Sequence, residues 1–110
     1  MAQNFRRYVA RQVGTSAVTL FTADSFDTIV GIALANVTSS EIKVDVILND
    51  ADSSHDVYLI KNAPIIEGQA RQVIDGGATY VVKSGDVLKV VSDTASSCDV
   101  IVSVVDAISE

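Results

Sequence analysis

Among its 110 residues the sequence has one cysteine, one histidine, one proline and no tryptophan. The lone Cys98 excludes an intramolecular disulfide and the two-cysteine motifs of redox and zinc sites. The lone His55 is the one residue that could act as the base of a histidine-dependent catalytic triad. Three Tyr and three Phe residues supply few of the stacking platforms that bind sugars or single-stranded nucleic acids.

Long apolar runs are also absent. The longest, such as residues 29–35, end after a few positions, whereas a membrane-spanning helix needs about 20. No basic segment followed by an apolar one opens the chain, so we expect neither a transmembrane segment nor a secretory signal. Hydrophobic residues make up 48% of the chain and charged residues 20%, which is too apolar for a disordered protein. The length suits one domain, and we expect a single folded domain over residues 1–110.

β-Branched residues are abundant. Val, Ile and Thr number 18, 10 and 7, against 5 Leu, and such residues fit a pleated sheet and lose side-chain freedom in a helix. The glycine-containing triplets 75–77 and 84–86 are turn signals, because glycine adopts the positive φ of tight hairpin turns. Strands are predicted at residues 17–23, 27–38, 41–48, 57–61, 69–74, 79–83, 87–92 and 99–105. We therefore expect an all-β fold, an antiparallel sandwich of about eight strands or a jelly-roll-like small barrel.

Three local features refine this prediction. The nearly continuous apolar segment 27–38 is typical of a central strand, and Gly31 within it indicates a bulge or close packing. The short link of Ser39 and Ser40 favours an antiparallel hairpin with the strand that follows. Pro64 cannot donate a hydrogen bond to a neighbouring strand, so we place its segment at a sheet edge or in a crossing between sheets.

The charge is uneven along the chain. Arg6, Arg7 and Arg11 lie in the first eleven positions, where no acidic residue occurs, and the remaining 99 residues hold five basic and 14 acidic residues. We interpret residues 1–14 as a short basic N-terminal arm and first strand. An acidic body disfavours nonspecific binding to nucleic acid. We therefore expect the arm to dock onto a protein, and we do not expect a nucleic-acid partner.

One segment resembles the first half of a calcium loop, because oxygen-bearing side chains occupy alternate positions. These residues are Asp50, Asp52, Ser54 and Asp56. The pattern then fails, because His55 stands where the sharp turn needs glycine and Lys61 stands where a bidentate glutamate is needed. We interpret the segment as a solvated acidic hairpin loop and predict no metal and no cofactor.

No catalytic set is evident. No serine occupies a G-x-S-x-G elbow that would pair with His55. Cys98 heads the apolar face of a predicted strand without an activating base nearby, so we expect a buried small hydrophobe rather than a nucleophile. Carboxylate pairs such as Asp75 and Asp86 lie where turns use Asp for backbone hydrogen bonds. We therefore predict that the protein is not an enzyme.

Two predicted strands carry apolar residues toward both faces. Ile101 and Val105 point away from the face formed by the other valines of their strand, and Val81 points away from its neighbours. A two-layer sandwich needs one apolar face per sheet, so we expect another subunit to cover the second face. The candidate interaction residues are Arg6, Arg7, Arg11, Ile101 and Val105.

The second half of the chain carries a series of short motifs. They are residues 58–64 (YLIKNAP), 67–68 (EG), 74–76 (IDG), 84–90 (SGDVLKV) and 99–103 (DVIVS). In the first half, residues 21–36 contain a strand followed by an apolar strand that ends in Asn. With these motifs the chain resembles, over most of its length, the small β-rich virion structural proteins of tailed bacteriophages, especially myovirus-like phages of marine cyanobacteria.

The resemblance implies a non-enzymatic sandwich that assembles as a homo-oligomer, a trimer or larger, and attaches to other virion proteins. Its place would be the virion, as a capsid decoration or fibre or on the tail, neck or baseplate, after synthesis in the host cytoplasm. It implies no small-molecule substrate and no membrane partner. The alternative, from another class, is a carbohydrate- or receptor-binding sandwich for host adhesion, which would use exposed aromatic side chains: Tyr58, Tyr80 and Phe26.

Overall fold

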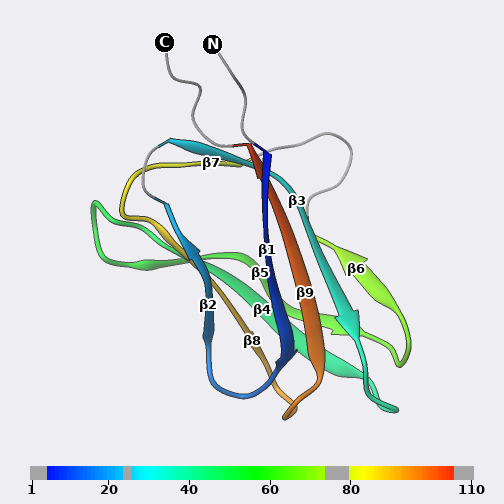
Figure 1. Cartoon of the computed structure of the whole chain (residues 1–110). Helices are drawn as coiled ribbons and strands as arrows, with labels where there is room; N and C mark the ends of the chain where they lie inside the picture. Colours follow the sequence, from blue (N-terminus) through cyan, green and yellow to red (C-terminus); the bar gives the residue numbers. More distant parts are fainter. Residues whose placement is uncertain (1–4, 24–25, 74–79, 106–110) are drawn as a thin grey trace.

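The structure, a computed structural model, describes residues 5–23, 26–73 and 80–105. Within these ranges the regular elements are all strands, and no helix there is long and apolar enough to span a membrane. The strands are β1 (Phe5–Val13), β2 (Val18–Thr22), β3 (Asp27–Asn36), β4 (Ile42–Asn49), β5 (Asp56–Ile65), β6 (Ala70–Gln72), β7 (Tyr80–Val82), β8 (Val87–Ser92) and β9 (Cys98–Val105) (Figure 1). Their pairings are antiparallel, which confirms the predicted fold class.

The strands form two packed sheets. Sheet A has the order β1-β9-β3, and the far edge of β3 pairs with both β6 and β7. Sheet B has the order β2-β8-β4-β5. Because β6 and β7 share one position beside β3, the chain fills four positions in each sheet. This order, reached by repeated crossing between the sheets, is that of a jelly roll. The two packed sheets confirm the antiparallel sandwich that the sequence predicted.

The core lies between the sheets and follows from side-chain alternation. On β4, Ile42, Val44 and Val46 are fully buried, as their spacing predicts. On β9, Val102 is fully buried whereas its neighbour Ile101 is 42% exposed. Each fully buried aliphatic side chain contributes about 1.5–3 kcal/mol relative to an exposed one. The core therefore uses one face of each sheet and leaves the other faces outside.

The predicted hairpin across Ser39 and Ser40 is wrong. The strand before this link, β3, belongs to sheet A, and the strand after it, β4, belongs to sheet B. Asn36 explains the crossing, because its buried side chain donates hydrogen bonds to the carbonyl oxygens of Ser40 (2.7 Å) and Ile65 (2.8 Å). Its Oδ1 accepts from the backbone N–H and the hydroxyl of Thr38. These bonds hold residues 37–41 as an arch between the sheets.

The first basic residues lie in a strand rather than in a separate arm. β1 pairs with β9 from Phe5 opposite Val105 to Val13 opposite Cys98. The physical reason is an inward-facing apolar set that a charge-based interpretation overlooks: Val13 is buried and Tyr8 packs against the core. The Tyr8 ring also stacks on Phe21, with 4.6 Å between ring centroids.

Other local predictions are confirmed. The β3–β9 register shifts between Ile29 and Gly31, which is the predicted bulge. Pro64 lies in β5 at the edge of sheet B, where a missing N–H is tolerated. Gly85 has a φ of +94° in the turn after β7, a conformation that favours glycine. The predicted turn at residues 75–77 lies outside the described residues.

Candidate interaction surface

The outer face of sheet A is apolar in a row that crosses three strands. Val9 on β1 lies opposite Ile101 on β9, which in turn lies opposite Ala33 on β3. Val9 is 59% exposed and Ile101 is 42% exposed. A second row joins half-buried Val105 to Thr28 and to Val81, which is 67% exposed. The apolar residues of β1, β9, β3 and β7 that do not face the core therefore lie on one surface.

This surface is hollowed where the second half of β1 pairs with the start of β9. The hollow, called the outer groove here, has a volume of about 370 Å³. Its lining combines the apolar row with small residues of β3 and β6 and two charged residues: Val9, Ala10, Arg11, Ala33, Leu34, Ala35, Ala70, Asp99, Val100 and Ile101. Alanines on β3 and β6 leave the space that larger side chains would fill. The outer groove is therefore a shallow apolar site with a charged rim.

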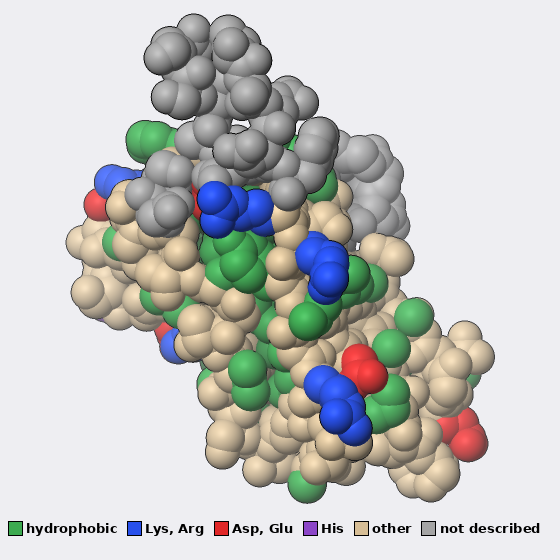
Figure 2. Space-filling model, in the orientation of Figure 1, with side chains coloured by type: hydrophobic (Ala, Val, Ile, Leu, Met, Phe, Trp, Pro, Cys, Tyr) green, Lys and Arg blue, Asp and Glu red, His purple; other side chains and the backbone are tan. Residues whose placement is uncertain are grey.

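Basic residues are divided between the sheets by type. All four arginines lie in strands of sheet A: Arg6, Arg7 and Arg11 on β1 and Arg71 on β6. The four lysines lie in sheet B or in the turn that leads into it: Lys43, Lys61, Lys83 and Lys89. Figure 2 shows basic side chains beside hydrophobic ones on the face formed by β1 and β9. Protein interfaces are enriched in arginine and depleted in lysine, and sheet A shares this preference for arginine.

The structure brings the predicted interaction residues together on one pair of strands. Arg7 lies opposite Ser103, and Arg6 opposite Val104; these four residues line a second hollow beside the outer groove. Among the described residues, neither Arg7 nor Arg11 forms an ion pair. The sequence analysis did not identify four residues of this surface: Val9, Ala33, Ala35 and Ala70. They lie together only because β1, β9, β3 and β6 pair with one another.

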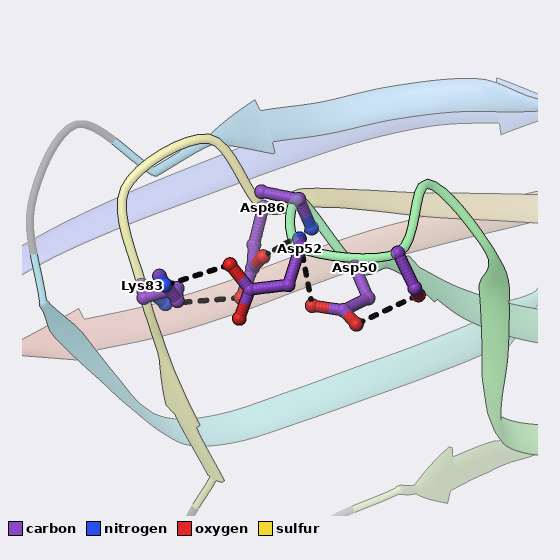
Figure 3. Close-up of polar contacts among 6 residues, drawn as sticks. Asp50, Asp52, Lys83 and Asp86 are labelled. Atoms are coloured by element: carbon purple, nitrogen blue, oxygen red, sulfur yellow. Dashed lines mark hydrogen bonds and ion pairs between the residues drawn. The ribbon is translucent and has the colours of Figure 1, made fainter.

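The acidic segment forms the connection between β4 and β5, and its carboxylates bind groups of the protein itself (Figure 3). The Ser53 hydroxyl donates a 2.8 Å hydrogen bond to Asp50 and lowers the pKa of that carboxyl below its ordinary value. Asp52 forms a 2.8 Å ion pair with Lys83. Asp56 accepts from the Asn49 side chain at 3.0 Å and pairs with Lys89, and the Asn49 bond is the larger cause of its lowered pKa.

Asp86 fastens this loop to the turn before β8. Its buried carboxylate accepts hydrogen bonds from the backbone N–H of Ala51 (2.8 Å) and of Lys83 (3.0 Å). Each of its two oxygens is therefore used by the backbone, as expected for a turn aspartate. Among the described residues, no group of three or more His, Cys, Asp or Glu side chains is placed to hold a metal ion. The loop geometry is that of an acidic hairpin turn.

The candidate catalytic residues lie apart. His55 is exposed at the tip of the β4–β5 connection, and Cys98 is fully buried in the core at the start of β9. Burial raises the pKa of the Cys98 thiol to about 11, far from the range of a nucleophilic thiolate. The buried position confirms the interpretation of Cys98 as a small core hydrophobe.

The aromatic side chains that a sugar-binding site would need are divided between the sheets. Tyr58 lies on β5 of sheet B, with the Lys61 ammonium 4.4 Å from its ring centroid. Phe26, which is 65% exposed, precedes β3 of sheet A, and Tyr80 packs against the core from β7. Residues on opposite sheets do not form one platform for a sugar ring.

The described strands form a jelly-roll sandwich in which the outer face of sheet A carries an apolar row beside arginines. No protein-family model matches the chain, and no curated protein matches its sequence. Among solved structures it is similar to a chain in the T13 particle of infectious bursal disease virus, with a TM-score of 0.56, 12% identity, and coverage of 94% of this chain and 31% of that one. It is also similar to VP2 in a subviral particle of the same virus, with a TM-score of 0.52, 12% identity, and coverage of 93% and 33%.

These matches show a shared fold. The chain spans about a third of the length of either viral chain.

Proposed function

We propose that the protein is a non-enzymatic virion structural protein that assembles with copies of itself and with other virion proteins through the outer face of sheet A. The observation that carries this proposal is the difference between the two sheets. Sheet A exposes Val9, Val81 and Ile101 and holds every arginine, whereas sheet B holds the strand lysines. A surface of this kind is typical of a protein that is covered by a neighbour.

Two further observations support a place in a virus particle. The jelly roll is a common architecture of viral capsid domains, and the similar chains described above come from viral particles. The assignment to a tailed bacteriophage of the cyanophage type comes from the sequence motifs of residues 58–103. On that basis we place the protein on the virion, after synthesis in the host cytoplasm, as a capsid decoration or fibre or as a tail, neck or baseplate component.

The first test is the mass of the full-length chain in solution, measured by light scattering over a range of concentrations. We expect a discrete homo-oligomer, a trimer or larger, rather than the 11.6 kDa monomer. Ile101→Asp and Val9→Asp place a charge on the apolar row, and we expect either variant to shift the mass toward the monomer.

The matched control is Val37→Asp. Val37 is 48% exposed, like Ile101, but lies in the arch between β3 and β4. We expect this variant to keep the mass of the unaltered protein. A monomer at every concentration, or equal effects of all three substitutions, would overturn the proposal.

A further inference from the structure

The outer groove and the connection between β4 and β5 are complementary. We propose that the outer groove of one copy receives the hairpin tip of a second copy, where the hairpin tip is residues 50–57. The inference rests on the proposed function and adds to it the surface that the neighbouring copy contributes. The contact joins two different surfaces, so repeating it in one direction generates a closed ring or an open filament, and a two-fold dimer results only where each tip enters the groove of the other copy.

Shape is the first argument. In Figure 1 the hairpin tip reaches beyond β2 at one side of the molecule, while β6, which borders the outer groove, lies at the other side. Every residue from 51 to 58 is exposed. The groove and the tip therefore lie far apart within one copy, and the tip projects far enough to contact a neighbour.

Rigidity is the second argument. The Asp86 carboxylate binds the backbone N–H of Ala51, and Lys83 pairs with Asp52, so the turn before β8 holds the tip in place (Figure 3). Within the tip, the N–H of Ser54 donates to the carbonyl oxygen of Asp50 at 2.7 Å. A segment that is already ordered loses little conformational freedom when it binds.

Charge and apolar area are the third argument. The tip carries Asp52, whose side chain is 67% exposed, and Val57, which is 49% exposed. The groove carries Arg11 at its rim and Val9 in its apolar row. Arginine binds carboxylates through two parallel hydrogen bonds, and such pairs give an interface its orientation. The tip therefore offers a carboxylate to Arg11 and an apolar side chain to the apolar row of the groove.

The same charges argue against other arrangements of two copies. If two outer faces met with their β1 strands opposed, Arg7 and Arg11 of one copy would lie near those of the other, and like charges across an interface are unfavourable. Asp99 lies in the same groove lining.

The hairpin tip carries three aspartates at residues 50, 52 and 56, of which Asp52 pairs with Lys83 and Asp56 with Lys89. The Asp52 side chain stays 67% exposed and is open to a second cation. A head-to-tail contact brings unlike charges together at every repeat.

A charge-reversal experiment tests this contact. We expect Asp52→Lys and Arg11→Glu each to weaken self-association about tenfold or more, measured by light scattering or sedimentation on the full-length chain. A single chain with both substitutions again has unlike charges at each contact, so it should recover most of the association. Glu67→Lys is the matched control, because it makes the same charge change in the exposed turn before β6, and we expect no effect.

A second measurement detects the contact directly. The chain with both Ser53→Cys and Ala70→Cys should form disulfide-linked oligomers under mild oxidation, and neither single variant should do so. Cys98 is buried and does not interfere.

The outcomes separate the two proposals. An oligomer that dissociates with Ile101→Asp but persists with Asp52→Lys and with Val57→Asp would overturn the role of the hairpin tip and leave the proposed function intact. A wild-type chain that stays monomeric would overturn the proposed function itself.

Discussion

Asp99 on β9 accepts a 2.8 Å hydrogen bond from the backbone N–H of Gln12 on β1, at the point where the pairing of these strands shifts. Gln12 has a φ of 53°, in the left-handed region. Sheet B repeats the arrangement: Asp45 on β4 accepts a 2.6 Å hydrogen bond from the N–H of Asn62 on β5, whose φ is 52°. Each sheet thus has an edge-strand bulge held by an aspartate of the next strand, and such bulges discourage uncontrolled pairing at an edge.

The first prediction concerns this bulge in sheet A. Asp99→Ala removes the acceptor for the Gln12 N–H and should lower the free energy of unfolding by about 1–2 kcal/mol, measured by urea denaturation. Gln12→Gly keeps the hydrogen bond and relieves the left-handed backbone, so it should be neutral or stabilising by about 0.5 kcal/mol. If Asp99→Ala were as stable as the unaltered protein, the bulge would not depend on this carboxylate.

The second prediction concerns the arch between the sheets. Asn36→Ala should destabilise the protein by about 3 kcal/mol, because the buried amide donates two hydrogen bonds and accepts two. Asn36→Asp should also destabilise it, because a carboxylate cannot donate to the carbonyl oxygens of Ser40 and Ile65. Thr38→Ala, which keeps the Asn36 amide, should cost about 1 kcal/mol. Equal losses for the Ala variants of Asn36 and Thr38, by thermal or urea unfolding, would contradict this account.

The third prediction concerns the thiol. Burial raises the Cys98 pKa from an ordinary 9.0 to about 11, so very little thiolate forms at pH 8. Modification by dithiobis-nitrobenzoate should be very slow in the folded protein and fast after unfolding in guanidinium. Fast labelling of the folded chain at pH 8 would show that β9 opens or that the thiol is accessible.

The fourth prediction concerns pH. The pKa of Asp93 lies below its ordinary value of 3.8, chiefly because the Lys43 backbone N–H donates to it at 3.0 Å. A depressed folded pKa contributes stability that is present above pH 4 and is lost as pH falls through the folded pKa. Asp93→Asn should therefore reduce the difference in urea midpoint between pH 7 and pH 3. An unchanged difference would show that this aspartate plays no part in acid sensitivity.

Most strands could be predicted from the sequence, because β-branched residues and turn signals act locally. The buried set of β4 also follows directly from the alternation of Ile42, Val44 and Val46. The arch was not predictable from the length of its link. It depends on Asn36 meeting Ile65 across 29 positions, and no local pattern reports such a contact.

The candidate surface was predictable in part. Ile101 and Val105 were identified because the alternation of residues along a single strand indicates which of them share a face. Val9 was missed because the charges of its neighbours led to the interpretation of an arm. The alanines of the groove carry no signal until β3 is paired with β6.

The pairing of β1 with β9 also has a consequence for synthesis. Phe5 lies opposite Val105, so among the described strands β1 pairs in sheet A with a strand that follows about a hundred residues later. While the chain emerges from the ribosome, β1 has no neighbouring strand, and pairing of such distant segments is slow compared with local contacts. The row formed by Val9 and Ile101 therefore requires both strands, and a chain in which β9 has not yet joined β1 does not present it.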